Sequence, residues 1–393
     1  MDCLSSPHKA HKRSYRHNTI TLKFSLISFI LPIRNLVMLT FTTYPDQQKD
    51  MDRFIENYPA SVEYIAPATQ VKGLKPKRNR SCRFYGRAAD LTTFRNKPHI
   101  IPRFLGNLHG ISDFECDDCN HHFGKLESHF ADYLGIARSI LSAGSEKIPK
   151  FKSPGETLIA SRAKEFLNKG ALDISNADGQ SFHFDPENLK WGISYTKPPH
   201  IPINVYKTLL KIALSVLPDN EIPDYKVLID FLLHDKNAGA FRPFAKVFQL
   251  TTAFKTFRPY CIIFKRKDLG VKFPLHMVYF AYENLSYQFF LPYHSRDVLH
   301  IDYKDRVDLL FAPPLIFADQ HDQEEVTAEL LDLSEQTIQR NANGHITFHA
   351  DAAFFKGIYN GETNGFTEQP FSATSITNII LTTDGKPEMI KRE

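Results

Sequence analysis

Apolar residues recur at helical spacing in several segments of the chain. The first clear case is Glu115–Gly135. Its apolar positions follow one another at steps of three and four residues, which gives a helix one apolar face. These positions are Phe123, Leu126, Phe130 and Leu134. We therefore predict a helix over this segment.

A second helix is predicted at Asn204–Leu217, with the sequence NVYKTLLKIALSVL. Asn204 precedes the apolar run and belongs to a residue type favoured at helix N-caps. Lys207 and Lys211 lie one turn apart, and we expect them on a solvent-exposed face rather than against phosphate. A further helix is predicted at Tyr225–His234.

The pattern changes after residue 257 to short runs of aromatic and β-branched residues. These runs read RPYCIIFKR, LHMVYFAYE and SYQFFLPYH, and Gly, Pro or Asn separates them. Such runs are typical of strands in an antiparallel sheet. Together with the helices they predict an α+β fold, in which the larger C-terminal part mixes both elements. The acidic run Asp319–Glu325 is predicted to be an exposed loop.

Breaks in composition suggest four regions. We assign 1–50 as a leader, 51–78 as a basic linker, 79–145 as a compact motif region, and 155–393 as an α+β recognition or regulatory domain. Linker-like Gly, Pro and charge at Lys72–Ser81 and Glu146–Glu156 mark the boundaries.

The leader places basic residues before an apolar stretch, as a secretory signal does. However, Lys23, Pro32 and Arg34 interrupt the apolar run. No run reaches the ~20 apolar residues of a membrane helix, so membrane association is not expected. We favour translation from Met38 or Met51 over a signal or anchor, and expect the rest of the chain to fold without the leader.

Composition is that of an ordinary globular protein, with 42% hydrophobic and 23% charged residues and a net charge of +4 over 393 residues. The positive charge is concentrated between Lys72 and Arg103, where Asp90 is the single acid. Such density indicates either a polyanionic partner or a solvated linker. The residues that we expect to contact nucleic acid are Lys77, Arg78, Arg80, Arg83, Arg87, Arg95, Lys97 and Arg103.

Three of the five cysteines, Cys82, Cys116 and Cys119, fall within one short segment. An odd, clustered set does not fit a secreted disulfide framework. It indicates a thiolate metal site in a reducing compartment, and we expect a cytoplasmic location.

The same segment contains further motif residues. His99 lies in His-Ile-Ile-Pro, a Gly-Asn turn at Gly106 and Asn107 follows, and the predicted helix opens with Glu-Cys-Asp-Asp-Cys-Asn and then Phe-Gly. This combination, over about residues 80–140, resembles the HNH endonuclease family. The resemblance implies a small zinc-knuckle ββα-metal finger at 79–145 that hydrolyses phosphodiester bonds in DNA.

The resemblance also implies roles for individual residues. His99 matches the general base, Asn107 a residue that orients it, and Asn120 a ligand of a catalytic divalent cation, Mg²⁺ or Mn²⁺. Glu127, seven residues after Asn120, is a candidate carboxylate ligand on the same helical face. A structural zinc ion would bind Cys82, Cys116 and Cys119. No small-molecule cofactor is expected, and the oligomeric state is left open.

Two positions differ from the family pattern. Tyr85 stands where a fourth cysteine is expected, and its phenol is a poor zinc ligand. We expect water or a nearby histidine, His121 or His122, in its place. Pro98 precedes His99 where many members have an acid.

Structural readings stay open for each residue: His99 as a strand residue, Asn120 as an N-cap, and Glu127 as a surface acid. The alternative functions are a nucleic-acid-binding protein with weakened catalysis, and a sensor whose C-terminal domain binds an unrelated ligand.

Overall fold

The structure is a computed structural model. It describes residues 20–21, 40–42, 48–142, 148–163, 171–176, 181–185, 190–236, 238–251, 256, 258–267, 273–297, 316–317, 327–349, 358–360, 365–367 and 378–381. The predicted loop Asp319–Glu325 and most of the leader lie outside these residues. No helix in the described ranges has both the length and the hydropathy of a bilayer-spanning segment.

The chain forms two compact units, each built from two sequence segments. One unit joins Met1–Gly124 to Tyr206–Glu335, and the other joins Lys125–Val205 to Gln336–Glu393. Helices α2 (Asp117–Leu134) and α4 (Pro202–Val216) each contain a boundary between units. The compact units therefore differ from the predicted regions 79–145 and 155–393.

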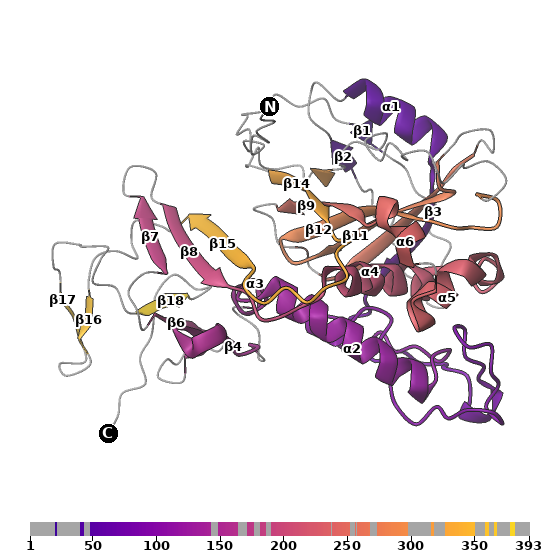
Figure 1. Cartoon of the computed structure of the whole chain (residues 1–393), viewed down its shortest axis with the longest axis horizontal. Coiled ribbons are helices and arrows are strands. Elements are labelled where there is room, and N and C mark those ends of the chain that lie inside the picture. The colour runs from indigo at the N-terminus through magenta and orange to yellow at the C-terminus, as the bar shows by residue number, and fades with distance from the viewer. Residues whose placement is uncertain are drawn as a thin grey trace, which may run out of the picture. The chain divides into compact units, whose positions relative to one another are not determined.

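A six-stranded antiparallel sheet forms the core of the first unit (Figure 1). The strand order is β14-β9-β12-β11-β10-β3, and every neighbouring pair is antiparallel. The three strands predicted from aromatic runs are β10, β11 and β12, so this prediction and the α+β class are confirmed. In sheet order the strands are Thr327–Asp332, Lys246–Thr251, Leu285–Leu291, His276–Tyr282, Tyr260–Lys265 and Ala60–Ile65.

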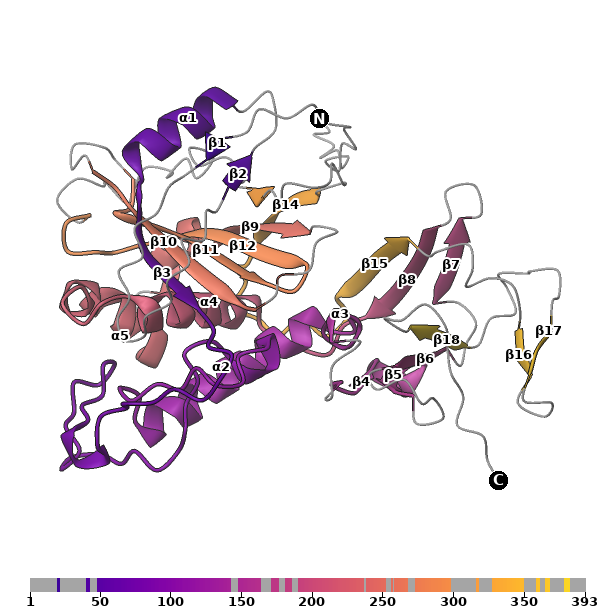
Figure 2. The same cartoon turned by 180° about the vertical axis from the view of Figure 1, so that it is seen from behind.

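Helices cover both faces of this sheet (Figure 2). On one face, Phe54 of α1 (Gln48–Asn57) meets Phe264 of β10 with ring centroids 5.7 Å apart. On the other face, the Tyr225 hydroxyl lies 2.5 Å from Nδ1 of His276 in β11. Because Phe264 pairs with the residue after His276, the two side chains point to opposite faces. Double coverage explains why every residue of β11 and β12 is buried.

The prediction of a linker at 51–78 is wrong for the first half of this segment. Residues up to Asn57 belong to α1, and Ala60–Ile65 forms β3 at the edge of the sheet. Met51 and Phe54 are fully buried. The helix has few apolar residues, so its composition resembles that of a linker, although Phe54 packs on the sheet.

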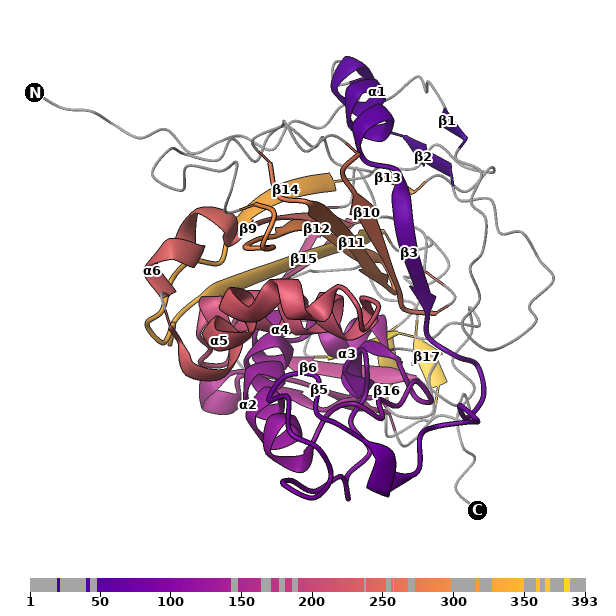
Figure 3. The same ribbon diagram turned by 90° about the vertical axis from the view of Figure 1, so that its right-hand side faces the viewer.

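The predicted helices are confirmed as α2, α4 and α5 (Lys226–His234). Figure 3 shows α4 and α5 together beneath the sheet. Two predictions about α4 are wrong, the N-cap at Asn204 and the exposed face with Lys207 and Lys211. The helix begins at Pro202, so Asn204 lies inside its first turn. Lys207 and Lys211 are buried at 1% exposure, because apolar residues surround α4 on almost every side.

Shorter elements complete the described chain. The helices α3 and α6 are Ala137–Leu141 and Ala238–Phe241. The 3-10 helices η2 to η6 are Lys77–Asn79, Arg103–Leu105, Pro154–Glu156, Ile222–Tyr225 and Arg242–Phe244. Short strands β1, β2 and β13 pair as Ile20–Thr21, Thr40–Thr42 and Ile316–Phe317, and β16 and β17 as Ile358–Asn360 and Gly365–Thr367.

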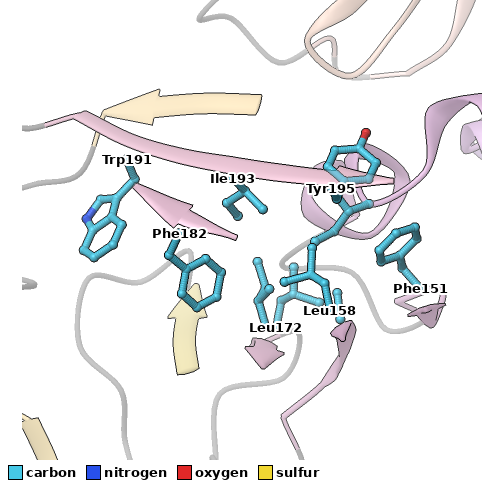
Figure 4. Close-up of a cluster of buried hydrophobic side chains, with 10 residues drawn as sticks. Phe151, Leu158, Leu172, Phe182, Trp191, Ile193 and Tyr195 are labelled. Atoms are coloured by element: carbon cyan, nitrogen blue, oxygen red, sulfur yellow. The ribbon is translucent and has the colours of Figure 1, made fainter. Parts of the chain in front are cut away.

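The second unit contains a three-stranded and a four-stranded antiparallel sheet. Alternate residues of the central strand β8, Trp191, Ile193 and Tyr195, pack with Leu158 and Leu172 of the other sheet (Figure 4). One sheet has the order β15-β8-β7 and the other β18-β6-β5-β4. In that order the strands are Asn343–His349, Lys190–Thr196, Phe182–Asp185, Asn378–Leu381, Leu172–Asn176, Leu158–Arg162 and Phe151–Lys152.

Candidate functional site

His99 lies on a short hairpin that precedes helix α2. It forms an antiparallel bridge with Ile111, and the N–H of Ile100 donates to the carbonyl of Gly110 over 3.0 Å. The connecting loop contains η3 and Gly106, whose φ of 89° suits glycine. His99 forms an isolated bridge and does not belong to a regular strand, so the predicted short strand is not formed, whereas hairpin and helix follow each other in the predicted order.

Asn107 closes the loop of this hairpin. Its side chain is fully buried, and Nδ2 donates to the carbonyls of Ile101 and Gly110 over 2.8 and 3.0 Å. Oδ1 accepts the N–H of Gly110 over 2.7 Å. A Cβ at Gly110 would lie 2.1 Å from the Tyr64 hydroxyl, so the loop requires glycine there. The Asn107 side chain thus fixes the loop, and its amide does not bond to the imidazole of His99.

The imidazole of His99 is half-buried. Its Nδ1 is buried and has no hydrogen-bond partner among the described residues. Burial lowers the pKa of His99, and the positive charges of Arg103 and Lys211 lower it further. The backbone carbonyl of Asn107 raises the pKa of His99, as a nearby acceptor does, although its contact with the imidazole lacks hydrogen-bond geometry. His99 is therefore neutral at neutral pH.

A buried ion pair holds the backbone at His99. Lys211 of α4 donates from Nζ to the His99 carbonyl over 2.8 Å and lies 3.3 Å from the Glu115 carboxylate. The side chains of Lys211 and Glu115 are 2% and 1% exposed. Sequence reasoning missed this pair, although a lysine within an otherwise apolar helix is a visible signal.

Cys82, Cys116 and Cys119 come together as the spacing predicts. Their sulfur atoms all lie within 4.8 Å of one another in a buried cluster. Sγ of Cys82 lies 3.5 Å from Sγ of Cys119. Two thiolates on one tetrahedral zinc ion lie ~3.8 Å apart, given Zn–S bonds of ~2.3 Å. The cluster therefore has the size and donor atoms to hold a metal ion.

The three thiols differ in acidity. The hydrogen bond from Cys119 lowers the pKa of Cys82 to about 5 against the opposing effect of burial, and the backbone N–H of Tyr85 lowers it further. The same hydrogen bond raises the pKa of Cys119, while burial raises that of Cys116. Cys82 is thus the most readily ionised of the three thiols, and thiolate is the form that binds metals.

Tyr85 lies beside the cluster in a tight turn. The N–H of Gly86 donates to the Cys82 carbonyl over 2.8 Å, and the N–H of Tyr85 donates to its sulfur over 3.4 Å. Burial raises the pKa of Tyr85, as do the charges of Cys119 and Cys116, so its phenol stays neutral. The ring instead stacks under the guanidinium of Arg87, 4.7 Å away.

No fourth ligand is evident in the described ranges. Within them, no further His, Cys, Asp or Glu joins the three cysteines. His122 is not part of the cluster, and its Nε2 instead lies 2.8 Å from the carbonyl of Leu232. His121 is exposed. The predicted histidine ligand is therefore not supported, and water remains the expected fourth ligand.

Asn120 and Glu127 both lie on α2. This helix begins at Asp117, so Asn120 is within the first turn and the N-cap reading is wrong. Asn120 and Glu127 are both half-buried, and the boundary between the compact units falls between them. The described residues show no group of three acidic or histidine ligands around Asn120.

Arg83 has a structural position that contradicts its predicted role in DNA binding. Its Nη1 donates to three carbonyls at the end of α4, and Nη2 lies 2.6 Å from Asp219. The guanidinium also lies 3.7 Å from the ring centroid of Phe114, and the side chain is 8% exposed. The other predicted contacts are exposed or, for Arg80, half-exposed: Lys77, Arg78, Arg80, Arg87, Arg95, Lys97 and Arg103.

The loop with Arg95 and Lys97 is held to α2 by Asp117. Its carboxylate accepts the Thr93 hydroxyl over 2.5 Å and the N–H of Arg95 over 2.9 Å. Burial would raise the pKa of Asp117, but these hydrogen bonds lower it overall. The two cations are therefore presented from an ordered loop.

Comparisons with known proteins assign no family. No protein-family model, no curated protein and no solved structure matches the chain. The function of this chain must therefore be inferred from the chemistry of its site.

Proposed function

We propose that this protein is a metal-dependent endonuclease of the HNH type, which hydrolyses phosphodiester bonds in DNA with His99 as general base. The main support is the state of His99: its imidazole is half-buried, and burial with the nearby cations lowers its pKa and favours the neutral form. A neutral imidazole can accept a proton from an attacking water near neutral pH. Lys211 and Asn107 fix the surrounding backbone, which limits the movement of the base.

A catalytic divalent cation, Mg²⁺ or Mn²⁺, would supply charge stabilisation at the phosphate when bound. Asn120 and Glu127 are the α2 residues proposed to hold it. Pro98 supplies no carboxylate next to His99. We expect water molecules in the positions that protein ligands leave open, as is usual for Mg²⁺.

The cysteine cluster supports a structural zinc ion in the same proposal. It joins the turn at Cys82 to the start of α2 at Cys116 and Cys119. Zinc at this point would fix the helix that contains Asn120 relative to the rest of the finger. Three thiolates and a water complete a tetrahedral site.

DNA is the proposed substrate because of the exposed cations around the finger. Arg103 lies close enough to lower the pKa of His99, and the Asp117 loop presents Arg95 and Lys97. Contacts of this kind bind phosphate without regard to sequence.

Plasmid cleavage with Mg²⁺, Mn²⁺ or EDTA tests the proposal. His99→Ala should reduce the cleavage rate by ~10²–10⁴-fold, the usual effect of losing a general base. His121→Ala is the matched control, because this exposed histidine lies on α2. Equal rates for wild type and His99→Ala would refute the assignment. DNA binding by the wild type without metal-dependent cleavage would instead support a binding protein that lacks catalysis.

A further inference from the structure

A second group of chemically active side chains lies in the other compact unit, on the sheet β15-β8-β7. Side chains alternate along β8, so Trp191, Ile193 and Tyr195 enter the apolar core seen in Figure 4. Gly192 and Ser194 are on the opposite face. His183 pairs with Gly192 and His345 with Ser194, which places both histidines on that same polar face.

Ring nitrogens of both histidines meet the same hydroxyl. Nδ1 of His345 lies 2.9 Å from Oγ of Ser194, and Nε2 of His183 lies 3.2 Å from it. The hydroxyl has one proton and can donate it to only one imidazole, so the other imidazole must donate to Oγ. One nitrogen from each ring is thus directed at a shared point on the surface of the sheet.

Gly192 provides the space for this arrangement. A Cβ at Gly192 would lie 3.0 Å from Cε1 of His345 and 3.5 Å from Cβ of His183. Glycine inside a strand often marks such a close approach. The ring centroids of the histidines are 6.4 Å apart, and both side chains are exposed, so the rings can turn towards a common ligand.

A cavity of about 460 Å³ adjoins the pair. Ser194 and His345 are among its lining residues. The lining is rich in hydroxyl and amide groups, contributed also by Ser153, Thr157, Ser181, Thr196 and Asn343. A ligand held by the histidines would therefore have open positions facing a polar space.

We propose that His183 and His345 bind a divalent transition-metal ion, with Ser194 as a neutral oxygen ligand. Neutral imidazole is a preferred donor for zinc, nickel and copper ions, whereas Mg²⁺ and Ca²⁺ prefer carboxylates. Two ligands of one tetrahedral zinc ion lie ~3.3 Å apart, given bonds of ~2.0–2.1 Å, and the two nitrogens lie 2.9 and 3.2 Å from the Ser194 hydroxyl, close to that spacing. The proposal is independent of the nuclease function.

Trp191 provides a direct assay, because it is the single tryptophan of the chain and precedes Gly192 in β8. The full chain is first given one equivalent of Zn²⁺, which the three buried cysteines should take up. Ni²⁺ is then titrated in, and tryptophan fluorescence is recorded. Saturable quenching is expected for the wild type, since Ni²⁺ quenches fluorescence at short range.

His183→Gln and His345→Gln should each weaken Ni²⁺ binding at least ten-fold, because each removes one of two imidazoles and keeps a polar side chain. Gly192→Ala should also weaken it by displacing the ring of His345. His121→Gln is the matched control and should bind like wild type. Wild-type affinity in both sheet variants, or equal weakening by His121→Gln, would overturn the proposal.

Discussion

Lys211→Met offers a quantitative test of how the His99 hairpin and Glu115 are held to helix α4. Methionine keeps most of the length of the lysine stem but removes the ammonium group, so Glu115 loses the cation that lies 3.3 Å away. Glu115 is 1% exposed on its side chain and cannot recover the lost interaction from water. Removing one member of a buried ion pair typically costs about 3–5 kcal/mol of unfolding free energy.

Lys207→Met is the matched control on the same helix. Lys207 is equally buried and pairs with Asp235, but the Asp235 side chain is 73% exposed. Its carboxylate remains solvated when the partner is lost, so the electrostatic loss should be at most about 1 kcal/mol. The double variant Lys211→Met with Glu115→Gln should recover part of the loss, because it leaves no buried charge unpaired.

Urea unfolding of the four proteins measures these differences. The reasoning would be refuted if Lys211→Met cost no more than Lys207→Met, or if Glu115→Gln gave no recovery in the double variant. Such a result would mean that Glu115 holds no charge in the folded protein, or that water reaches it.

Three further outcomes are expected. Tyr85→Cys should raise the thermal midpoint and the resistance to chelators of the zinc-loaded protein, because a fourth thiolate completes the site; an unchanged midpoint with no zinc by metal analysis would contradict this. Neutralising Arg78 and Arg80 should flatten the log–log salt dependence of DNA binding by roughly one unit per lost contact. By contrast, Arg83→Gln should lower the free energy of unfolding by about 2–3 kcal/mol, because charged hydrogen bonds are lost. An equal effect of all three arginine substitutions on the salt slope would refute the structural role of Arg83. Burial raises the pKa of Asp297 to about 7, so between pH ~4 and 7 the folded state binds a proton that the unfolded state has lost. The free energy of unfolding should therefore fall as pH rises through this window. Asp297→Asn should remove this pH dependence from unfolding curves, and the same pH dependence in wild type and variant would contradict the prediction.

Local sequence patterns predicted those parts of the fold that local physics determines. Helix α2 has apolar residues at helical spacing, and β10 to β12 are aromatic and β-branched. Cys116 directly precedes α2 and Cys119 lies in its first turn, so their proximity follows from the geometry of the helix start, and only Cys82 had to come from elsewhere. The three-cysteine cluster could therefore be predicted.

Features that depend on distant segments could not be predicted. Lys207 and Lys211 share the spacing of an exposed face, and only the packing of α4 shows that both are buried. Arg83 belongs to a basic stretch typical of DNA contacts, but its acceptors come from residues more than 130 positions later. The role of a single charged residue of this kind is determined by the tertiary fold, and the overall charge of its segment does not reveal it.

The contacts of Arg83 and Lys211 also determine how far the segment 79–145 is a separable module. Arg83 needs the end of α4 as its acceptor, and the Glu115 carboxylate needs the ammonium of Lys211. A fragment limited to residues 79–145 lacks both partners. Transfer of residues 79–145 into another protein, or their exchange for a homologous segment, would thus require helix α4 to be transferred with them. The residues that build this site therefore come from a discontinuous part of the sequence. Its two segments are separated by most of the second compact unit and must be kept together for the site to form.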